Sequence, residues 1–310
     1  MTLISTIICT YNRAESLKKT LESLLRQESQ GAFDYEILLV DNNSTDQSKS
    51  VIETFIPRFE GKLRSFFQPI PGKSLSMNMA IPLAKGDILA FTDDDVVLPP
   101  SWLYELYQCF TKYGCDGVGG RVLPDYPPQT PQWIKDNAVQ LAGAVVIYEY
   151  GESTRPLDRT MHPFIGCNYA FRRRMFTEHG LFRPDLGPGT NALGEDTEFV
   201  ERLLAEGIRL YYCGKARVWH PYDPKRFNWR QLARWHVAIG RCEAQREIQS
   251  KEKFIYYFGA PRYLLKGLAV DMIRLVIDCF NRLGRWNAWR SLFRKVGMIL
   301  EYRRMHRQRQ

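Results

Sequence analysis

Short β-rich segments and amphipathic helical segments alternate along the N-terminal third of this 310-residue chain. Four segments are apolar and β-rich: residues 3–10, 35–40, 62–68 and 87–91. Three segments between them carry apolar residues at helical spacing: residues 14–27, 47–55 and 74–84. Strands that alternate with helices of this length are typical of a parallel sheet covered on both faces. The pattern therefore predicts an α/β fold with a mostly parallel, Rossmann-like sheet.

Three consecutive carboxylates, Asp93, Asp94 and Asp95, come just after the last of these strands. In open α/β sheets, ligands bind beyond the carboxyl ends of the strands. Adjacent acids repel one another, and a hard cation that prefers oxygen ligands would neutralise them. The triplet therefore predicts metal or phosphate binding. A solvated turn before the helix expected at residues 102–113 is an equal alternative.

Polar side chains also follow the first two strands, where a nucleotide would fit. These side chains are Thr10, Tyr11, Asn12, Arg13 and Asp41. Asp41 can accept a hydrogen bond from a base N–H while Tyr11 offers a stacking face, and Arg13 or Lys73 can face phosphate. The alternative is turn chemistry, because Asn, Asp and Ser dominate loops for backbone reasons. Neither a Walker A sequence nor Gly-x-Gly-x-x-Gly follows the first strand, so the usual ATP and dinucleotide cradles are excluded.

A second acidic pair follows a glycine-rich loop at residues 186–194. Glu195 and Asp196 lead into a helix expected over residues 199–206. A helix N-terminus favours the ionised, proton-accepting form of a carboxylate, so this pair is a candidate for general-base catalysis. The alternative is that these first-turn acids only stabilise the helix.

Two further regions are harder to interpret. His220 ends a β-like segment at residues 211–220, where a histidine usually packs but is also a feasible third metal ligand. Residues 121–158 are rich in proline and include a β-like segment at 142–150, and we interpret them as an acceptor-side insertion. The aromatic residues of this insertion either stack on sugar rings or pack in the core.

Five motifs occur in an order that resembles family 2 inverting glycosyltransferases of GT-A fold. They are residues 10–13, 40–46, 86–95, 166–173 and 194–198, and the resemblance covers about residues 3–222. It implies a nucleotide-sugar donor, a divalent cation and a hydroxyl acceptor on a polysaccharide, glycolipid or lipid-linked glycan. It also implies that Asp41 reads the base, Asp93 lies near the ribose and Asp95 holds the metal. Asp196 is then the catalytic base, with Glu195 beside it toward the acceptor.

The full prediction for the site follows from this resemblance together with the strand ends. The donor-binding residues are Thr10, Tyr11, Asn12, Arg13, Asp41, Lys73, Asn78, Asp93 and Asp94. Mg²⁺ or Mn²⁺ is held by Asp95, Asp93 and His220, although the triple acid leaves open which pair of aspartates holds the ion. We expect a UDP-sugar ahead of GDP- and dTDP-sugars.

The implied reaction is a single displacement. The cation neutralises the departing nucleoside diphosphate, and Asp196 takes the proton of the attacking hydroxyl, so the anomeric centre is inverted. Gly187 and Gly189 suit a loop that orders over the donor. Two alternatives are a sugar-nucleotide nucleotidyltransferase, which usually carries a glycine-rich phosphate loop that is missing here, and a non-catalytic nucleotide-sugar-binding module, which would not need Glu195 and Asp196.

The net charge of +9 is confined to the C-terminal part of the chain. Residues 251–310 carry 14 Lys or Arg against 4 Asp or Glu, whereas residues 1–250 carry 29 against 30. This shift predicts a catalytic domain at 1–250 and a basic, amphipathic helical tail at 251–310. The tail either packs on the catalytic domain or binds an anionic membrane surface. Nucleic acid is not expected as a partner, because the neutral body offers it no supporting site.

The cysteines and the apolar segments indicate a cytoplasmic location. The seven cysteines are odd in number and contain no Cys-x-x-Cys pair, which argues against a disulfide scaffold and a zinc ribbon. The apolar start at residues 3–9 lacks a basic region, so no signal peptide is expected. No apolar stretch of about 18 residues is available to span a bilayer. We therefore expect a cytoplasmic protein that is peripheral on the cytoplasmic face of the membrane if the tail binds lipid.

Overall fold

A computed structural model describes residues 1–158, 160–190, 192–249 and 254–308. The chain divides into two compact units. The first comprises residues 1–184 and 195–222, and the second comprises residues 185–194 and 223–310. Helix α8 (Trp229–Gln249) falls in the second unit, and the boundary expected near residue 250 stays a prediction.

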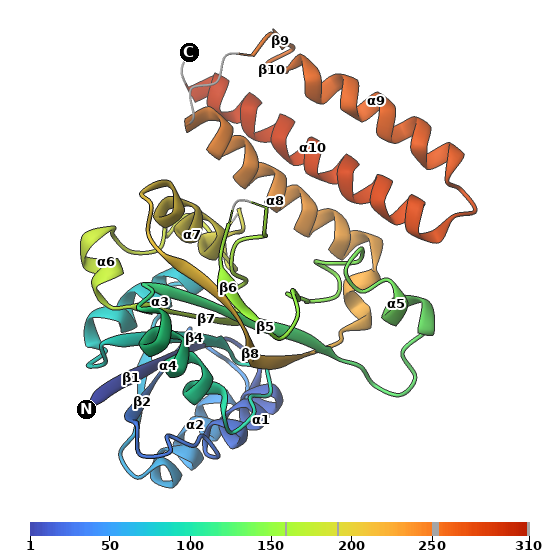
Figure 1. Ribbon diagram of the computed structural model, residues 1–310. Helices are drawn as coiled ribbons and strands as arrows, with labels where there is room; N and C mark the ends of the chain where they lie inside the picture. Colours follow the sequence, from blue (N-terminus) through green and yellow to red (C-terminus); the bar gives the residue numbers. More distant parts are fainter. Residues whose placement is uncertain (159, 191, 250–253, 309–310) are drawn as a thin grey trace. The chain divides into compact units, whose positions relative to one another are not determined.

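The first unit is built on an eight-stranded sheet with the order β3-β2-β1-β4-β7-β5-β8-β6 (Figure 1). The strands are β1 (Thr2–Thr10), β2 (Phe33–Asp41), β3 (Leu63–Phe67), β4 (Ile88–Asp93), β5 (Gly117–Asp125), β6 (Thr154–Pro156), β7 (Asn168–Arg172) and β8 (Leu210–Pro221). Strands β1 to β4 pair in parallel, as do β5 and β8, whereas β7 is antiparallel to β4 and β5 and β6 is antiparallel to β8. The carboxyl ends of β1, β2 and β4 therefore meet at one edge of the sheet.

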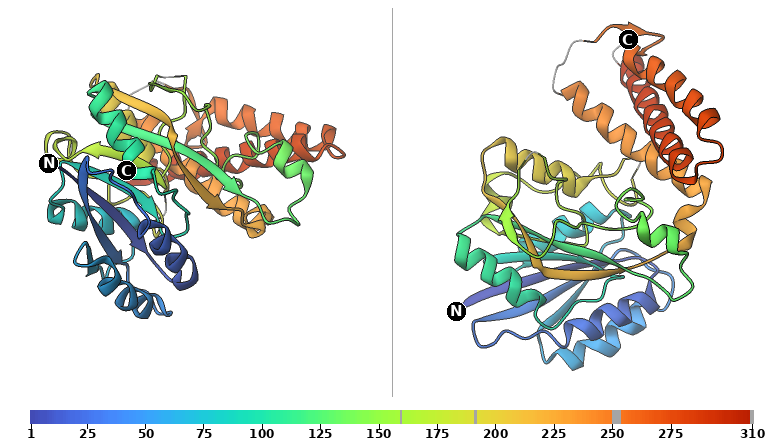
Figure 2. Two further views of the ribbon diagram at one scale, coloured as in Figure 1. Left: turned by 60° about the horizontal axis from the view of Figure 1, so that its bottom comes forward. Right: turned by 45° about the vertical axis from the view of Figure 1, so that its right-hand side comes forward.

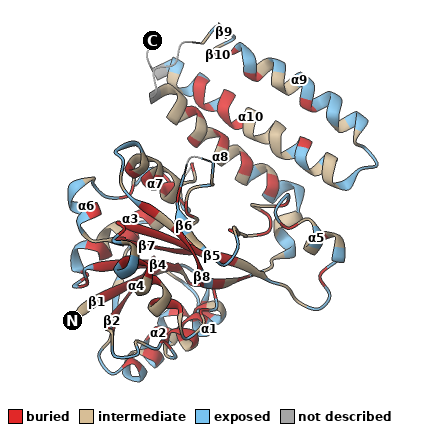
Figure 3. Cartoon of the chain, in the orientation of Figure 1, coloured by how far each residue is buried: buried red, intermediate tan, exposed pale blue. Residues whose placement is uncertain are grey.

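Helices flank this sheet (Figures 1 and 2). They are α1 (Ala14–Leu24), α2 (Ser48–Phe55), α3 (Lys73–Ala80), α4 (Trp102–Tyr113), α5 (Gln132–Asp136), α6 (Arg174–Glu178) and α7 (Glu195–Ala205). The β4 side chains from Ile88 to Phe91 are buried, as expected for a strand covered on both faces, and Figure 3 shows the buried residues concentrated in the sheet. The predicted α/β fold class is confirmed.

Two local predictions differ from the structure. The helix expected over residues 74–84 ends at Ala80 and continues as a 3-10 turn, Ile81–Leu83, because Pro82 has no N–H to extend the helix. The β-like segment at residues 142–150 forms isolated bridges and no strand. Gly143, with φ of 103°, turns the backbone at the start of that segment, so the extended prediction was wrong there.

The pairing of β5 with β8 contains a bulge that Asn168 stabilises. Gly120 pairs with Cys213 and Arg121 pairs with Arg217, so β8 has three more residues than β5 at this point. Asn168 Nδ2 donates to the carbonyl oxygens of Arg121 at 2.9 Å and Ala216 at 2.8 Å. These bonds satisfy buried carbonyl groups that the interrupted ladder leaves unpaired. The bulge thereby fixes the register of the end of β8, where His220 lies.

An aromatic cluster holds α7 against the sheet. The Phe199 ring of α7 lies 4.8 Å from Phe176, 5.0 Å from Phe171 and 5.0 Å from Phe182, measured between ring centroids. Such close aromatic pairs contribute about 0.5–1.5 kcal/mol each beyond the burial of apolar area. The cluster therefore fixes the first turn of α7, which carries Glu195 and Asp196.

The second unit consists of α8, α9 (Arg262–Ile277) and α10 (Arg282–Gln308) with a short hairpin, β9 (Tyr256–Tyr257) and β10 (Ala260–Pro261). Glycines let α8 and α10 pack closely: a Cβ at Gly240 would lie 2.0 Å from the Arg294 carbonyl oxygen. A small core of Ala244, Ala260, Leu264, Met298, Ile299 and Tyr302 joins the helices. No helix within the described ranges combines the length and apolarity needed to cross a membrane.

Candidate active site

The loops after β1 and β2 are tied together by Asn12. Its Oδ1 accepts hydrogen bonds from the backbone N–H of Thr45 at 2.7 Å and of Asp46 at 3.3 Å, and its own N–H donates to Ser44 Oγ at 3.0 Å. Asn12 also has a positive φ of 53°, which asparagine tolerates better than most residues. In this structure Asn12 therefore stabilises a turn, which was the alternative to ligand binding, and it holds together the two loops that carry Tyr11 and Arg13 on one side and Ser44 to Asp46 on the other.

Asp41 and Thr10 lie side by side at the ends of β2 and β1, since they are paired in register. Asp41 is buried, and its Oδ1 accepts a hydrogen bond from the Ser44 N–H at 2.9 Å. Thr10 is also buried. Tyr11 is 55% exposed and offers its ring to solvent. This arrangement leaves Tyr11 and the second Asp41 oxygen available for a ligand.

Asn42 was not among the predicted site residues, yet it organises the loop that leads to Lys73. Its Nδ2 donates to the carbonyl oxygens of Gln68 at 3.0 Å and Ile70 at 2.7 Å, and its Oδ1 accepts from the Gly72 N–H at 2.8 Å. Gly72 has φ of 150° and stands directly before α3. The position of Asn42 directly after Asp41 in a strand-end loop was a signal for this role, but its distant backbone partners were not visible in the sequence.

Each carboxylate of the acid triplet lies near a cationic side chain. Lys73 forms a close ion pair with Asp93 and donates a hydrogen bond to the Gly166 carbonyl oxygen at 3.3 Å. Arg13 forms a close ion pair with Asp95, and its Nε lies 3.8 Å from Asp94 Oδ1. The triplet is therefore ion-paired with Arg13 and Lys73, and the turn that it forms is not simply solvated.

Burial changes the protonation of these groups. It raises the pKa of Asp94 to about 7, although the Arg13 cation acts in the opposite direction. Burial alone lowers the pKa of Lys73, but the nearby Asp93 and Glu195 carboxylates outweigh it and raise this pKa well above its ordinary value. Lys73 is consequently held as a cation between the two acidic motifs.

The second acidic pair converges on the same place. A Cβ built on Gly166 would lie 3.1 Å from Lys73 Nζ and 3.4 Å from Asp196 Oδ2, so both side chains reach the backbone just before β7. Glu195 is 4% exposed, and burial, reinforced by the Asp196 charge, raises its pKa to about 7. Burial also raises the pKa of Asp196, with Lys73 opposing the shift. Burial thus acts against the helix N-terminus that was expected to favour the ionised form.

Two of the predicted metal ligands, Asp95 and His220, lie close together. His220 Nε2 lies 3.5 Å from Asp95 Oδ1, which is buried and has no hydrogen-bond partner within the described residues. No three His, Cys, Asp or Glu side chains in the described part of the chain form a ready-made metal site. Mg²⁺ is usually held by one or two carboxylates together with substrate phosphates, so the Asp95 oxygen fits such an ion. Asp93 is ion-paired with Lys73 in this structure, and its role as a metal ligand stays a prediction.

Asn78 has a different environment from the other predicted donor residues. Its Nδ2 donates to the Phe182 carbonyl oxygen at 2.7 Å, and its Oδ1 accepts from the Phe182 N–H at 3.1 Å. Both ends of the amide are thus bonded to backbone within the first unit, beside the aromatic cluster. A direct contact between Asn78 and a donor stays a prediction.

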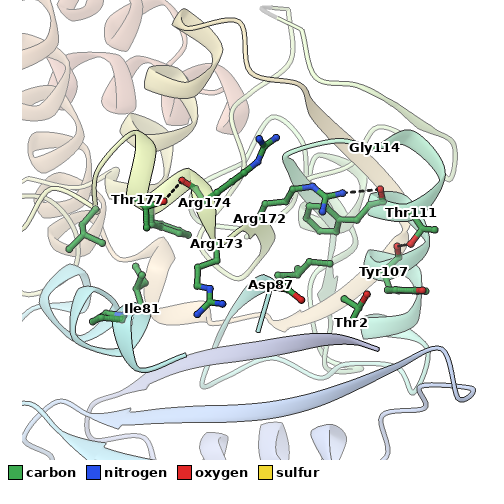
Figure 4. A pocket seen from close by; sticks show the side chains of 15 residues that line it. Thr2, Ile81, Asp87, Tyr107, Thr111, Gly114, Arg172, Arg173, Arg174 and Thr177 are labelled. Carbon is green, nitrogen blue, oxygen red and sulfur yellow. Dashed lines mark hydrogen bonds between the residues drawn. The ribbon is translucent and has the colours of Figure 1, made fainter. Parts of the chain in front are cut away.

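A cavity of about 1140 Å³ lies at the opposite edge of the same sheet (Figure 4). It is lined by Thr2 at the start of β1, by Asp87 just before β4 and by Arg172, Arg173 and Arg174. The arginines bond within the first unit: Arg172 to the Cys115 carbonyl oxygen at 2.9 Å, Arg173 to the Ala84 carbonyl oxygen at 3.1 Å, and Arg174 to the Asp116 carboxylate. The cavity contains none of the predicted site residues.

Comparison with known proteins identifies the family of the chain. A model of the family "Glycosyl transferase family 2" matches residues 5–180. Glycosyltransferase AglE of Haloferax volcanii is 32% identical over 269 residues, covering 85% of this chain and 80% of that protein. Glucosyl-dolichyl phosphate glucuronosyltransferase of the same organism is 26% identical over 240 residues, covering 76% and 72%.

The fold has a counterpart among solved structures. Mannosyltransferase PcManGT from Pyrobaculum calidifontis, in complex with GDP-Man and Mn²⁺, superposes with a TM-score of 0.61 at 15% identity, covering 96% of this chain and 86% of that one. The chain therefore belongs to glycosyl transferase family 2 and is a glycosyltransferase of GT-A fold. Family membership favours sugar transfer over the nucleotidyltransferase and the non-catalytic module that the sequence left open.

Proposed function

We propose that this glycosyltransferase moves a sugar from a nucleoside diphosphate sugar to an acceptor hydroxyl with inversion, assisted by Mg²⁺ or Mn²⁺. The observation that carries the proposal is the convergence of Asp93 and Asp196 on Lys73, although these acids lie about a hundred residues apart in the chain. A second acidic group beside the donor edge is what a single displacement needs, because a base must lie near the attacking hydroxyl.

The donor-binding residues follow from the strand ends. Asp41 has an oxygen available to accept a hydrogen bond from the base, and the exposed Tyr11 ring can stack on it. We assign Asp93 to the ribose. Arg13 and Lys73, which neutralise the acid triplet in this structure, supply positive charge for the diphosphate.

Asp95 and Asp93, with His220 as a third candidate, would hold the divalent cation. When bound, Mg²⁺ or Mn²⁺ supplies Lewis-acid neutralisation of the charge on the departing nucleoside diphosphate. The PcManGT complex contains Mn²⁺, which is consistent with a metal at this edge. A UDP-sugar remains our first expectation for the donor, with GDP- and dTDP-sugars as the competing classes.

Asp196 is our candidate for the catalytic base. The acceptor oxygen forms a bond to the anomeric carbon, its proton passes to Asp196, and the bond between the anomeric carbon and the diphosphate oxygen breaks with its electron pair on the diphosphate. A base whose pKa is raised toward neutrality accepts a proton more effectively than an ordinary aspartate. Glu195, buried beside it, lies toward the acceptor side in this proposal.

The acceptor is proposed to be a polysaccharide, a glycolipid or a lipid-linked glycan. One relative is named as acting on glucosyl-dolichyl phosphate, which makes a lipid-linked acceptor the most specific of these. We further propose a catalytic region at residues 1–250 and a basic tail at 251–310 that keeps the enzyme peripheral on the cytoplasmic face of the membrane; residues 250–253 and 309–310 lie outside the described residues.

The test is a donor panel with the full-length protein. Nucleotide release from UDP-, GDP- and dTDP-sugars is measured with Mg²⁺ or Mn²⁺ and with EDTA. We expect release from one donor class, dependent on the cation, and, with an acceptor present, a transferred sugar whose anomeric configuration, read by NMR, is opposite to that of the donor. A product that retains the configuration would exclude single displacement, and full activity in EDTA would exclude the metal.

A further inference from the structure

The outward side of α9 carries several exposed apolar side chains. We call it the α9 face and define it as Val270, Met272, Ile273, Val276, Ile277 and Phe280, the last of which lies in the turn after the helix. Val276 is 74% exposed, Ile277 73% and Phe280 98%. Residues 273, 276 and 277 follow helical spacing, so their side chains share one side of the helix, and Phe280 follows three residues after the helix ends. Figure 3 shows exposed residues along α9 and the turn that follows it.

The opposite side of α9 packs inside the second unit. Leu264 joins the small core with Met298 and Tyr302. Asp271 is 1% exposed, and one of its oxygens lies 2.6 Å from Lys295 Nζ on α10. Because this buried ion pair and the core fix which side of α9 faces α10, the outward side of the helix is set by the fold.

Basic side chains surround the apolar surface. Lys266 and Arg274 are exposed on α9, and Arg282 and Arg285 are exposed at the start of α10. Arg285 donates to the Cys279 carbonyl oxygen at 3.0 Å, which holds its positive charge beside Phe280. The acids of this hairpin are turned away from solvent, since Asp271 is buried and Asp278 is half-buried. The surface is thus apolar at its centre and cationic at its rim.

We propose that the α9 face binds the surface of a bilayer that contains anionic lipid. Phe280, Ile277 and Ile273 enter the headgroup region, and Arg274, Arg282 and Arg285 contact lipid phosphates. A second copy of the same face is a poorer occupant, because its cationic rim would repel the first. The function of this binding rests on the proposed transfer to a lipid-linked acceptor, because an enzyme bound to the membrane surface would have such an acceptor within reach.

The experiment is vesicle sedimentation with the full-length protein, without donor or acceptor. Wild-type protein should pellet with vesicles of phosphatidylcholine and phosphatidylglycerol and be released by salt. The double substitution Ile277→Ser and Phe280→Ser should reduce binding at least tenfold, since each buried methylene contributes appreciably to interfacial binding. Arg282→Gln should reduce it about fivefold on anionic vesicles.

The matched control is Phe258→Ser. Phe258 is 84% exposed in the turn between β9 and β10 of the same unit, outside the α9 face, so its substitution should leave binding unchanged. Equal binding by the double variant and wild type would overturn the proposal, as would wild-type protein that stays in the supernatant or binds neutral vesicles equally well. A dimer that the double variant dissociates, without vesicle binding, would assign the face to self-association instead.

The outcome is independent of the catalytic proposal. Loss of vesicle binding with normal nucleotide release would contradict the membrane proposal and not the proposed reaction. Vesicle binding without any turnover would contradict the proposed reaction and not the membrane proposal. Thermal unfolding of each variant, followed by circular dichroism, verifies that these exposed substitutions leave the fold intact.

Discussion

Charged side chains are arranged differently at the two edges of the central sheet, where the strands begin and where they end. At the carboxyl edge, Asp94 and Glu195 have pKa values raised to about 7. In addition, Arg13 forms an ion pair with Asp95, and Lys73 forms one with Asp93. At the opposite edge a cavity of about 1140 Å³ is lined by arginines that bond to backbone carbonyl oxygens and to Asp116. The buried acids with raised pKa values therefore lie at the carboxyl edge and not in the cavity, and such groups are typical of functional sites.

The largest expected difference between the edges comes from removing the proposed base. Asp196→Asn should lower transfer by about 10²–10⁴-fold, since general-base catalysis typically contributes this much. Donor and metal affinity, measured by calorimetry, should stay close to wild type because the substitution touches only the acceptor proton. Glu198→Gln, in the same first turn of α7, is the control and should retain turnover. Wild-type-like turnover of Asp196→Asn would refute the assignment.

A smaller effect is expected for the metal ligand. Asp95→Ala should weaken binding of the nucleoside diphosphate and the response to Mn²⁺ together, by about 10–100-fold, because the ion bridges protein and phosphate. Titration of nucleoside diphosphate with and without Mn²⁺ measures both. Asp87→Ala, at the other end of the same strand, should change neither. If Asp87→Ala weakened Mn²⁺-dependent binding as much as Asp95→Ala does, the assignment of the metal site to the carboxyl edge would be wrong.

The protonation of Glu195 predicts how stability depends on pH. The pKa of Glu195 is raised from 4.5 to about 7, so between these values the folded protein binds more protons than the unfolded chain. The free energy of unfolding should therefore fall as pH rises through this window, on the order of 1–3 kcal/mol. Urea unfolding at pH 5.5 and pH 8 measures it.

Two variants separate the contribution of Glu195 from that of other groups. Glu195→Gln should reduce the loss of stability between the two pH values, since it removes one of the buried acids. Glu198→Gln should leave that loss unchanged. An identical pH dependence in wild type and Glu195→Gln would show that this carboxyl is not held protonated by burial.

The smallest effect is expected at the arginine-lined edge. Arg173→Met removes the hydrogen bond to the Ala84 carbonyl oxygen and should lower the free energy of unfolding by about 1 kcal/mol. Nucleotide release should not change, because this side chain stands at the far end of the strands from Asp95. A large loss of turnover without a loss of stability would give the cavity a functional role and remove the contrast.

Much of the fold could be predicted because its first strands and helices are strongly periodic. The residues of β4, buried throughout from Ile88 to Phe91, form one apolar run, and the acids follow where the run stops. The bond from Trp102 Nε1 to Asn168 Oδ1, at 2.8 Å, could not be predicted, since it joins residues far apart in sequence. Long-range partners are set by tertiary packing and leave no local pattern.

In the candidate site, too, features with a local sequence pattern could be predicted and long-range contacts could not. The acids at the strand ends indicated Asp41 and the acid triplet as site candidates, because ligands bind beyond the carboxyl ends of strands in such sheets, and Lys73 was added as a cation for phosphate. The raised pKa of Glu195 was not foreseen, since it depends on how deeply the aromatic cluster sets the first turn of α7. Asn42 was missed because its backbone partners lie in a loop that the sequence leaves undefined.

The three extra residues of β8 lie between two stretches of ladder whose pairing does not depend on their number. Gly120 pairs with Cys213 before the bulge and Arg121 pairs with Arg217 after it, and directly paired residues of neighbouring strands face the same side of the sheet. His220 therefore takes its side of the sheet from Pro124, its partner on β5. A natural or engineered change in the length of this bulge leaves His220 beside Asp95 as long as the pairing beyond the bulge is kept.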